Sequence, residues 1–589
     1  MYPRLGLLLL AACATTPPPP PTPPAHATLA ITGAAIFDGE KLLPPGNVIL
    51  DGDHIVAVGD IPVPAGVETI DGKGKTVLPG LIDSHTHVLD PSNLEQALAF
   101  GVTTELDMFS VPEVIKKVRE ENSPGRADVR SAMTLATAPG GHGTQYGLKI
   151  PTVSKPEEAA AFVDARIAEG ADYIKIVLED GSTFGRPIPT LSVPTVAALI
   201  AAAHAKGKLA VVHVTTYEHA RAAIEAGADG LVHAFRDRAP PPGFGRSVAT
   251  RGAFVVPTLA VARSVSGEST AIGGEAAFAS MLTPDAKAGL AGKFQLQAKS
   301  ADAATRPLVV QLRDAGATIL AGTDAPNPGT AHGVSLHDEL ALLVEAGLSP
   351  TQALTAATAN PARAFQLPDR GRIAVGLRAD LLLVDGDPTK DIFATRHIAG
   401  VWRGGVRFDH AAFKAMVAEA QARPPAPKTV DVGKVSSFDD GTLATAFGHD
   451  WMPSTDQMIG GTSTVEPKVE NKELVIRGKL VVGKGPASWA GAMVMTGAQP
   501  FDPVDLSAKQ GLHFRARGDG KVYTVMVFAK SRGRMPASVL FKPGPTFAIY
   551  EMPWSKFEGL DGKDVQAVLF GASEEAGAFT LVIDDVEVR

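Results

Sequence analysis

The sequence has almost no cysteine, few aromatic residues and no long run of basic residues. With one cysteine among 589 residues, no disulfide can form within the chain. The 63 acidic and 55 basic residues give a net charge of −8, which offers nucleic acid no electrostatic footprint. A hydrophobic fraction of 45% with 20% charged residues is typical of a folded globular chain. These features exclude wholesale disorder, a polytopic membrane protein and a nucleic-acid partner.

The single cysteine, Cys13, directly follows the apolar stretch LGLLLLAA, which itself follows Arg4. This stretch is too short for the roughly 20 apolar residues that span a bilayer, and it is typical of a secretion signal. The tetrapeptide LAAC also resembles a bacterial lipobox, in which cleavage before the cysteine leaves a lipid-modified amino terminus. We therefore expect a lipoprotein signal peptide over residues 1–12, lipidation of Cys13 and a cell-envelope location, periplasmic or at the outer membrane. A plain secretory signal with a chance cysteine is the alternative.

Three regions outside the centre of the chain have distinct compositions. Proline dominates residues 13–27, which predicts an extended tether that holds a folded domain off a membrane surface. Short β-like runs with Asp-Gly turns fill residues 28–80 and return over 366–410, so we expect these two segments to complete one sheet, as a composite β-sandwich. After a linker over 411–434, alternating strands without helical periodicity predict an all-β sandwich over 435–589.

The central segment, residues 81–365, alternates apolar runs with helical stretches. Eight such runs occur, from LIDSHTH at 81 to ATILAGTDA at 317, and eight strand–helix repeats predict an α/β fold of the (β/α)8 TIM-barrel type. A doubly wound open sheet is the alternative, because periodicity does not reveal closure. The expected helices cover residues 92–100, 111–121, 155–169, 192–206, 217–227, 283–315 and 335–347.

Polar side chains end five of these predicted strands. In a parallel barrel the carboxyl ends of the strands hold the reactive groups, and side chains two apart on a strand share a face. Neutral imidazole is the commonest metal ligand, so histidines in this position indicate a metal site. Together these residues match the ligand complement of a two-metal hydrolytic site. They are His85 and His87, Lys175, His213, His233 and Asp324.

Lys175 is unusual because every neighbour in the run DYIKIVL is apolar. A charged ammonium is costly inside a buried strand, so the lysine must shift its pKa or gain a partner. Carboxylation by carbon dioxide is one solution, since the carbamate is an anion that can bridge two metal ions. The alternative is a structural lysine that reaches solvent at the strand end or pairs with Glu179 or Asp180.

The motifs VLPGLIDSHTHV, GADYIKI, AVVHVTT, GLVHAF and GTDA resemble the amidohydrolase superfamily, most closely its imidazolonepropionase-like and prolidase-like dipeptidase branch. The resemblance covers residues 28 to about 410. It implies a binuclear site, with zinc as the first choice of metal, and assigns each ligand a place. His85, His87 and Asp324 would hold one metal ion, His213 and His233 the other, and N6-carboxylated Lys175 would bridge both.

Such a site predicts a hydrolase in which a metal-bridging hydroxide attacks an amide carbonyl, while Asp324 moves the proton to the leaving amine. The expected substrates are small molecules or short peptides, in particular dipeptides or N-acyl amino acids. Hydrolysis of esters, lactones or carbamates on the same site is one alternative. A glycan-binding lipoprotein with an inactive barrel is another.

Residues near the predicted metal ligands are candidates for substrate contact. His142 in the loop GGHG resembles a substrate-orienting or transition-state hydrogen bonder, and a glycine-supported turn histidine is the alternative. An aromatic hydroxyl that some dipeptidases carry after the fifth strand is replaced by threonines 215–216, with Tyr217 further along as the candidate contact. Arg236 and Arg238 are alternative anion contacts, although we expect them to be solvated loop charges.

The C-terminal segment from 435 to 589 resembles the complex I intermediate-associated protein family, in motifs such as GHDWMPSTDQMIGGTSTVE. This resemblance implies a galactose-binding-like jelly roll. Trp451, Trp489 and Trp554 could stack on a sugar, which makes a glycan a candidate ligand, but tryptophans scattered in a sandwich are usually core residues.

Overall fold

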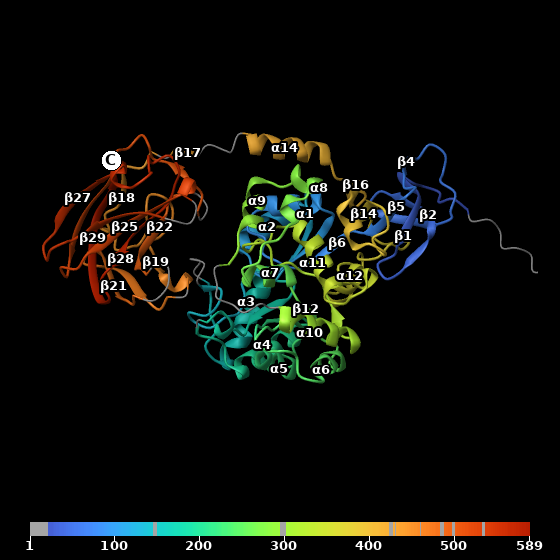
Figure 1. The fold of residues 1–589 in the computed structure, drawn as a ribbon, viewed down its shortest axis with the longest axis horizontal. Coiled ribbons are helices and arrows are strands. Elements are labelled where there is room, and N and C mark those ends of the chain that lie inside the picture. The colour runs from blue at the N-terminus through green and yellow to red at the C-terminus, as the bar shows by residue number, and fades with distance from the viewer. Residues whose placement is uncertain are drawn as a thin grey trace, which may run out of the picture.

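The computed structural model describes residues 22–144, 150–185, 187–294, 302–422, 428–429, 431–459, 461–482, 488–497, 501–532 and 536–589. The predicted signal peptide, Cys13 and most of the proline-rich tether lie outside these residues. Within the described part of the chain, no helix is both long and apolar enough to cross a membrane. Figure 1 shows an α/β part, joined through the long helix α14 (His410–Ala422) to an all-β part that contains the C-terminus.

An eight-stranded mixed sheet combines two segments that are distant in the sequence. The strands are β1 (Leu29–Phe37), β2 (Leu42–Asp51), β3 (His54–Gly59), β4 (Glu68–Asp71), β5 (Lys75–Pro79), β14 (Leu381–Asp385), β15 (Ile398–Arg403) and β16 (Val406–Arg407). Strand β14 joins the two segments by pairing antiparallel with β5. The fully buried Trp402 lies in the apolar core of this sheet with Ile31 and Leu381. The two segments thus share one continuous sheet, as expected from the sequence.

Eight parallel strands form the centre of the α/β part. They are β6 (Leu81–Thr86), β7 (Val102–Asp107), β8 (Asp128–Ser131), β9 (Ile174–Val177), β10 (Ala210–His213), β11 (Gly230–Val232), β12 (Phe254–Val256) and β13 (Thr318–Ile319). Strands β6 to β8 pair in sequence order, as do β9 to β13. Two isolated parallel bridges, Ala136 with Ile176 and Thr86 with Ala325, connect the two groups, so the pairing runs through all eight strands and returns to the first.

The seven predicted helical stretches of the α/β part are helical in the structure, which also has five helices that were not predicted, beginning at Phe244, Leu259, Ala276, Pro350 and Ala359. The helices are α1 (Pro91–Ala99), α2 (Pro112–Glu121), α3 (Ala159–Glu169), α4 (Val193–Ala205), α5 (Tyr217–Glu225), α6 (Phe244–Thr250), α7 (Leu259–Val265), α8 (Ala276–Ala279), α9 (Pro284–Ala291), α10 (Asp302–Asp314), α11 (Val334–Glu345), α12 (Pro350–Ala356) and α13 (Ala359–Ala364). Local capping sets several boundaries: the Ser192 side chain accepts from the backbone N–H of Thr195 at the start of α4. The helix expected over 283–315 is instead two helices, α9 and α10.

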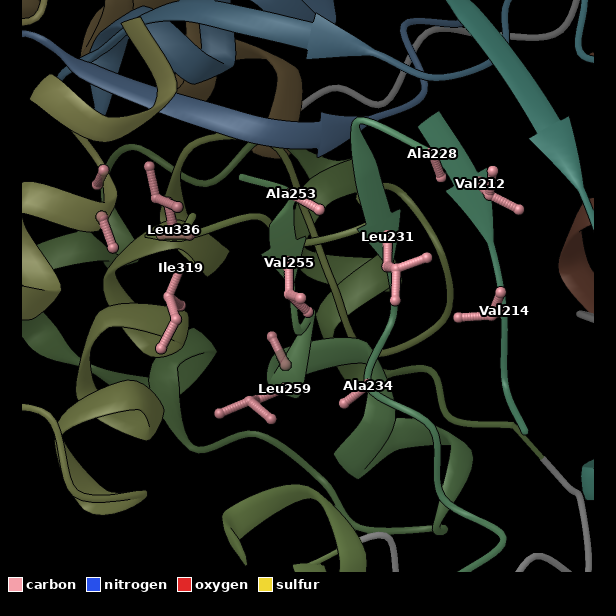
Figure 2. Packing of buried hydrophobic residues seen from close by; sticks show 14 of the residues in the cluster. Val212, Val214, Ala228, Leu231, Ala234, Ala253, Val255, Leu259, Ile319 and Leu336 are labelled. Atoms are coloured by element: carbon pink, nitrogen blue, oxygen red, sulfur yellow. The ribbon is translucent and has the colours of Figure 1, made fainter. Parts of the chain in front are cut away.

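Successive side chains along each parallel strand point alternately outward, into the core shared with the helices, and inward, to the inner face of the strands. Val212, Leu231, Val255 and Ile319 are register partners on β10 to β13, and they pack in the core that contains the helices (Figure 2). Their neighbours Val211 and Val232 belong to a different cluster. Because successive side chains point to opposite faces, His213 shares the face of Val211, and Lys175 shares that of Tyr173.

The C-terminal part is all-β, as predicted. One sheet contains β17 (Lys428–Thr429), β19 (Met452–Thr455), β22 (Ala490–Met495), β23 (Val504–Asp505), β25 (Tyr523–Ala529), β26 (Ala537–Phe541) and β28 (Val565–Ala572). The other contains β18 (Lys434–Ser436), β20 (Thr464–Glu470), β21 (Glu473–Leu480), β24 (Gly511–Gly518), β27 (Ala548–Pro553) and β29 (Gly577–Val588). One large apolar cluster draws residues from both sheets.

The tryptophans of this part do not form an exposed platform. Trp451 and Trp554 are only 1% and 5% exposed and belong to the apolar core. Trp489 packs on a smaller methionine-rich cluster, and its indole N–H donates to Ser454 Oγ at 3.1 Å. The interpretation as core residues is therefore confirmed for Trp451 and Trp554.

Replacing Phe514 by alanine tests how the all-β core is stabilised. Phe514 is fully buried, and its ring centroid lies 4.7 Å from that of Phe570 and 5.5 Å from that of Phe541. We expect Phe514→Ala to lower the free energy of unfolding of this part by about 3–5 kcal/mol, because it removes the buried ring and leaves a cavity. Urea unfolding followed by tryptophan fluorescence measures this, since three of the four tryptophans lie in the all-β part.

The matched control is Phe501→Ala, because the Phe501 side chain is 45% exposed. This variant should change the free energy of unfolding by no more than about 0.5 kcal/mol. Equal losses in the two variants would contradict the assignment of Phe514 to the core.

Candidate metal centre

The six side chains predicted as metal ligands come together at the carboxyl ends of the parallel strands. His85 and His87 lie at the end of β6, Lys175 on β9 and His213 at the end of β10. His233 and Asp324 lie in the turns after β11 and β13, and both have a left-handed backbone, with φ of 70° and 60°. This conformation is sparsely populated in non-glycine residues and is often found at functional sites.

The Asp324 carboxylate lies at the centre of the cluster. Its Oδ1 is 3.0 Å from His87 Nε2 and 3.4 Å from His85 Nε2. Its Oδ2 is 3.9 Å from His233 Nε2. The ligand atoms of His85, His233 and Asp324 all lie within 4.8 Å of one another, a spacing that one metal ion can bridge. Three imidazoles therefore direct a nitrogen at one carboxylate.

Hydrogen bonds on the far side of two rings fix their orientation. His87 Nδ1 lies 3.0 Å from the carbonyl oxygen of Phe109, and His233 Nδ1 lies 2.7 Å from Thr258 Oγ1. Because a carbonyl oxygen can only accept, His87 Nδ1 carries the proton and its Nε2 offers a lone pair to the cluster. Such outer contacts are typical of histidines that bind metal.

Burial favours the neutral form of three imidazoles of the cluster. It lowers the pKa of His85 and of His233 well below the ordinary value, and the neighbouring histidines and Lys175 lower both further. The pKa of His213 is also lowered by burial, although Glu179 opposes this. Neutral imidazole is the form that binds a metal.

Lys175 is buried, with 2% exposure, and its Nζ lies 3.4 Å from His85 Nε2. Among the residues that the structure describes, no carboxylate lies within 4.0 Å of this nitrogen. The alternative partners Glu179 and Asp180 instead contact His213 and His219. Burial lowers the pKa of Lys175 to about 7, although the charges of Asp324 and Asp107 oppose this. The amine is thus partly neutral at neutral pH, which is the reactive form for carboxylation.

Glu179 belongs to the site, although the sequence analysis treated it only as a partner for Lys175. Its carboxylate is fully buried, and Oε2 lies 3.4 Å from His213 Nε2. It also accepts hydrogen bonds from Thr215 Oγ1 and the backbone N–H of Gly181. Burial alone would raise the pKa of Glu179, but the contacts with His213 and Thr215 hold it below the ordinary value. The sequence feature that could have identified Glu179 as a site residue is its position just beyond the end of β9.

The predicted substrate contacts have different surroundings. The His142 ring centroid lies 4.9 Å from that of His213, so this loop histidine is beside the metal ligands. Burial lowers the pKa of His142 to about 3. The Tyr217 ring instead packs against Phe235 and Phe244, with centroids at 5.6 and 5.8 Å, so its contact with substrate stays a prediction.

The two loop arginines also differ from each other. Arg238 is 53% exposed and pairs with Asp237 at 3.2 Å, as expected of a solvated charge. The Arg236 guanidinium instead stacks on the Phe184 ring, with Cζ 4.2 Å from the ring centroid. The expectation of a solvated charge is therefore wrong for Arg236, because loops from neighbouring strands cover it.

A second polar layer lies behind the metal ligands. Asp83 accepts from the backbone N–H of His85 at 3.1 Å and of Thr323 at 3.0 Å, which ties the ends of β6 and β13 together. Nearby, His332 Nδ1 lies 2.9 Å from both carboxylate oxygens of Glu105, and both residues are buried. The contact with Glu105 raises the pKa of His332 despite its burial.

The site therefore belongs to a metal-binding hydrolase with an α/β fold. It combines buried imidazoles, one amine and carboxylates at the carboxyl ends of parallel strands. Residues 76–407 match the amidohydrolase family, and residues 443–569 match the complex I intermediate-associated protein 30 family. The first match spans more than half of the chain. This chain belongs to the amidohydrolase family, and both resemblances seen in the sequence are confirmed.

Individual relatives agree with this assignment. The imidazolonepropionase of Rubrobacter xylanophilus is 28% identical over 394 residues, which cover 61% of this chain and 90% of the relative. That of Geobacillus sp. (strain WCH70) is 31% identical over 346 residues, which cover 54% and 77%. The chain is therefore a hydrolase that acts on carbon–nitrogen bonds, in a family that uses divalent metals.

Solved structures show the same fold. A Xaa-Pro dipeptidase with methionine bound in its active site superposes with a TM-score of 0.54 at 22% identity, covering 65% of this chain and 99% of that one. The ochratoxinase of A. niger superposes with a TM-score of 0.52 at 23% identity, covering 65% and 96%.

Removing the imidazole beside Glu105 tests the polar layer behind the site. We expect His332→Leu to lower the free energy of unfolding of the α/β part by about 3–5 kcal/mol, because it leaves a buried carboxylate without its partner. Circular dichroism at 222 nm during urea unfolding measures this, since the helices of the described chain belong to the α/β part and its C-terminal extension α14.

The double variant Glu105→Leu/His332→Leu is the matched control. It replaces both members of the pair, so it should recover much of the loss. A double variant that is less stable than His332→Leu alone would contradict this account of the pair.

Proposed function

We propose that this protein is a binuclear metal-dependent amidohydrolase that cleaves amide bonds in dipeptides or N-acyl amino acids. The observation that carries the proposal is the convergence of six ligand side chains around Asp324 and Lys175. The cyclic pairing of the parallel strands supports a (β/α)8 barrel as the scaffold. The two packed antiparallel sheets of the C-terminal part are compatible with a galactose-binding-like jelly roll.

The donor set suits two divalent cations. We assign His85, His87 and Asp324 to one ion, and His213 and His233 to the other, with carboxylated Lys175 between them. Zinc is the first choice for imidazole, carboxylate and carbamate ligands. When bound, two such ions would supply a hydroxide nucleophile at neutral pH and polarise the substrate carbonyl. His233 Nε2 is also within 3.9 Å of Asp324, so this carboxylate lies between the two groups of ligands.

Other steps of the proposed hydrolysis depend on residues of the protein. The Asp324 carboxylate accepts the proton of the attacking water and returns it to the leaving nitrogen. His142, held neutral by burial beside His213, donates a hydrogen bond to the substrate. Glu179 accepts hydrogen bonds from His213 and from Thr215, and the first of these contacts fixes the orientation of the His213 ring.

Metal content and a change at Lys175 test this function. Purified protein should hold close to two metal equivalents and hydrolyse dipeptides or N-acyl amino acids. We expect Lys175→Ala to lose metal and to lower kcat/KM by a factor of about 100 or more, because the bridging anion is gone, with partial rescue by short carboxylates. Metal analysis with a kinetic assay measures both.

Lys206→Ala is the control, since Lys206 is a 50% exposed lysine on the surface. It should keep both metal and activity. One metal equivalent or none in the wild-type protein would overturn the bridging role of Lys175. On the same preparation, faster hydrolysis of lactones or aryl esters than of amides would favour the ester-hydrolase alternative.

We further propose that the protein is exported and anchored to a membrane by lipid on Cys13. The support is the sequence LAAC after an apolar stretch, followed by a proline-rich segment. Wild-type protein should sediment with membranes, whereas Cys13→Ser should move to the soluble fraction because it cannot be lipidated. Cell fractionation measures this, and equal membrane content in both would contradict the anchor.

A further inference from the structure

Arg236 occupies a position between three loops that surround the metal centre. It follows β11, and its backbone N–H donates to the carbonyl oxygen of Thr215, just after β10, at 3.0 Å. Its guanidinium stacks on Phe184 and donates from Nη2 to Thr183 Oγ1 at 3.2 Å. Both of these residues lie in the loop after β9. The loops that follow β9, β10 and β11 thus hold this side chain in place.

A short chain of hydrogen bonds connects the guanidinium to the metal ligands. Thr183 Oγ1 donates to Thr215 Oγ1 at 3.0 Å, and the latter donates to the Glu179 carboxylate. Glu179 in turn contacts His213 Nε2 at 3.4 Å. The Arg236 side chain is therefore next to the predicted metal ligands, at the same end of the strands, without being one of them.

The Arg236 guanidinium has N–H donors that are not used within the described part of the protein. Among the residues that the structure describes, no carboxylate lies within ion-pair distance of Arg236, and its Nε is buried without a hydrogen-bond partner. The exposed Arg238, by contrast, pairs with Asp237. Burial lowers the pKa of Arg236 to about 10, although the charge of Glu179 opposes this, so the group stays charged at neutral pH. A partly buried cation that has no carboxylate in direct contact is costly, and an anionic ligand bound to it would compensate for this cost.

We propose that Arg236 binds the α-carboxylate of the amino acid that leaves when the amide bond is cut. This inference rests on the proposed function and deepens it, because it assigns a residue to the free carboxylate that dipeptides and N-acyl amino acids carry one residue beyond the scissile bond. In such a substrate the carboxylate carbon lies no more than about 3.7 Å from the scissile carbonyl carbon. It therefore needs a cation adjacent to the metal centre, and the planar guanidinium can bind it with two parallel hydrogen bonds.

Binding of a non-hydrolysable ligand tests the inference directly. The probe is an N-acyl amino acid in which two methylene groups replace the scissile amide, compared by calorimetry with its neutral carboxamide. The wild-type, metal-loaded protein should bind the acid at least about 10-fold more tightly than the carboxamide. Arg236→Met should weaken binding of the acid by about 10- to 100-fold and bring the ratio of the two affinities close to one.

Matched variants separate recognition from a structural role. Arg238→Met removes an exposed arginine of the same loop and should keep the affinity ratio of the wild type. Arg236→Lys keeps the charge without the planar fork, so it should give an intermediate ratio; it also supplies the test if Arg236→Met does not fold. Loss of bound metal, or equal weakening of acid and carboxamide in both Arg236 variants, would overturn the proposal and leave Arg236 as a structural link between loops.

The test distinguishes failure of this inference from failure of the proposed function. If the protein hydrolyses amides but Arg236→Met keeps the preference for the acid, the carboxylate role of Arg236 is wrong and the function stands. If no amide is hydrolysed but the preference for the acid collapses in Arg236→Met, the carboxylate site stands and the proposed function is wrong.

Discussion

The burial of an amine among neutral imidazoles is the constraint on which the site depends. Lys175 is buried between the strands. Glu179, the carboxylate that could have paired with it, contacts His213 instead. A bare ammonium in this place would be strongly disfavoured, so the amine must be neutral or be converted to an anion. The carbamate that we propose would resolve the conflict, because the surrounding imidazoles and Asp324 are suited to cations that would balance its charge.

The fold supplies this environment through simple alternation. Parallel strands covered on their outer face by helices place every second side chain on the inner face, and the polar ones fall at the carboxyl ends. Left-handed turns at His233 and Asp324 then bring side chains from β11 and β13 toward those of β6. Asp83 joins the ends of β6 and β13 by hydrogen bonds. The C-terminal sheets have a separate apolar core.

Much of this could be predicted from the sequence, because hydrophobic periodicity marks strands, helices and the polar residues that end them. The six residues that we propose as metal ligands were selected in this way, and the structure brings their side chains together. The contact of Glu179 with the site was not predicted, because its partner His213 lies on the next strand. The burial of Arg236 was not predicted either, because the residues that cover it lie in a loop more than 50 residues away in the sequence. The similar composition of the two β segments indicated that they share one sheet, but local pattern does not show which strands pair, such as β5 with β14.

Crystallography of the metal-loaded protein with anomalous scattering tests the central claim most directly. The account predicts two anomalous peaks among the histidines and Asp324, with continuous electron density that extends from Lys175 Nζ to both. A single peak, with a bare lysine amine that contacts neither cation, would contradict it.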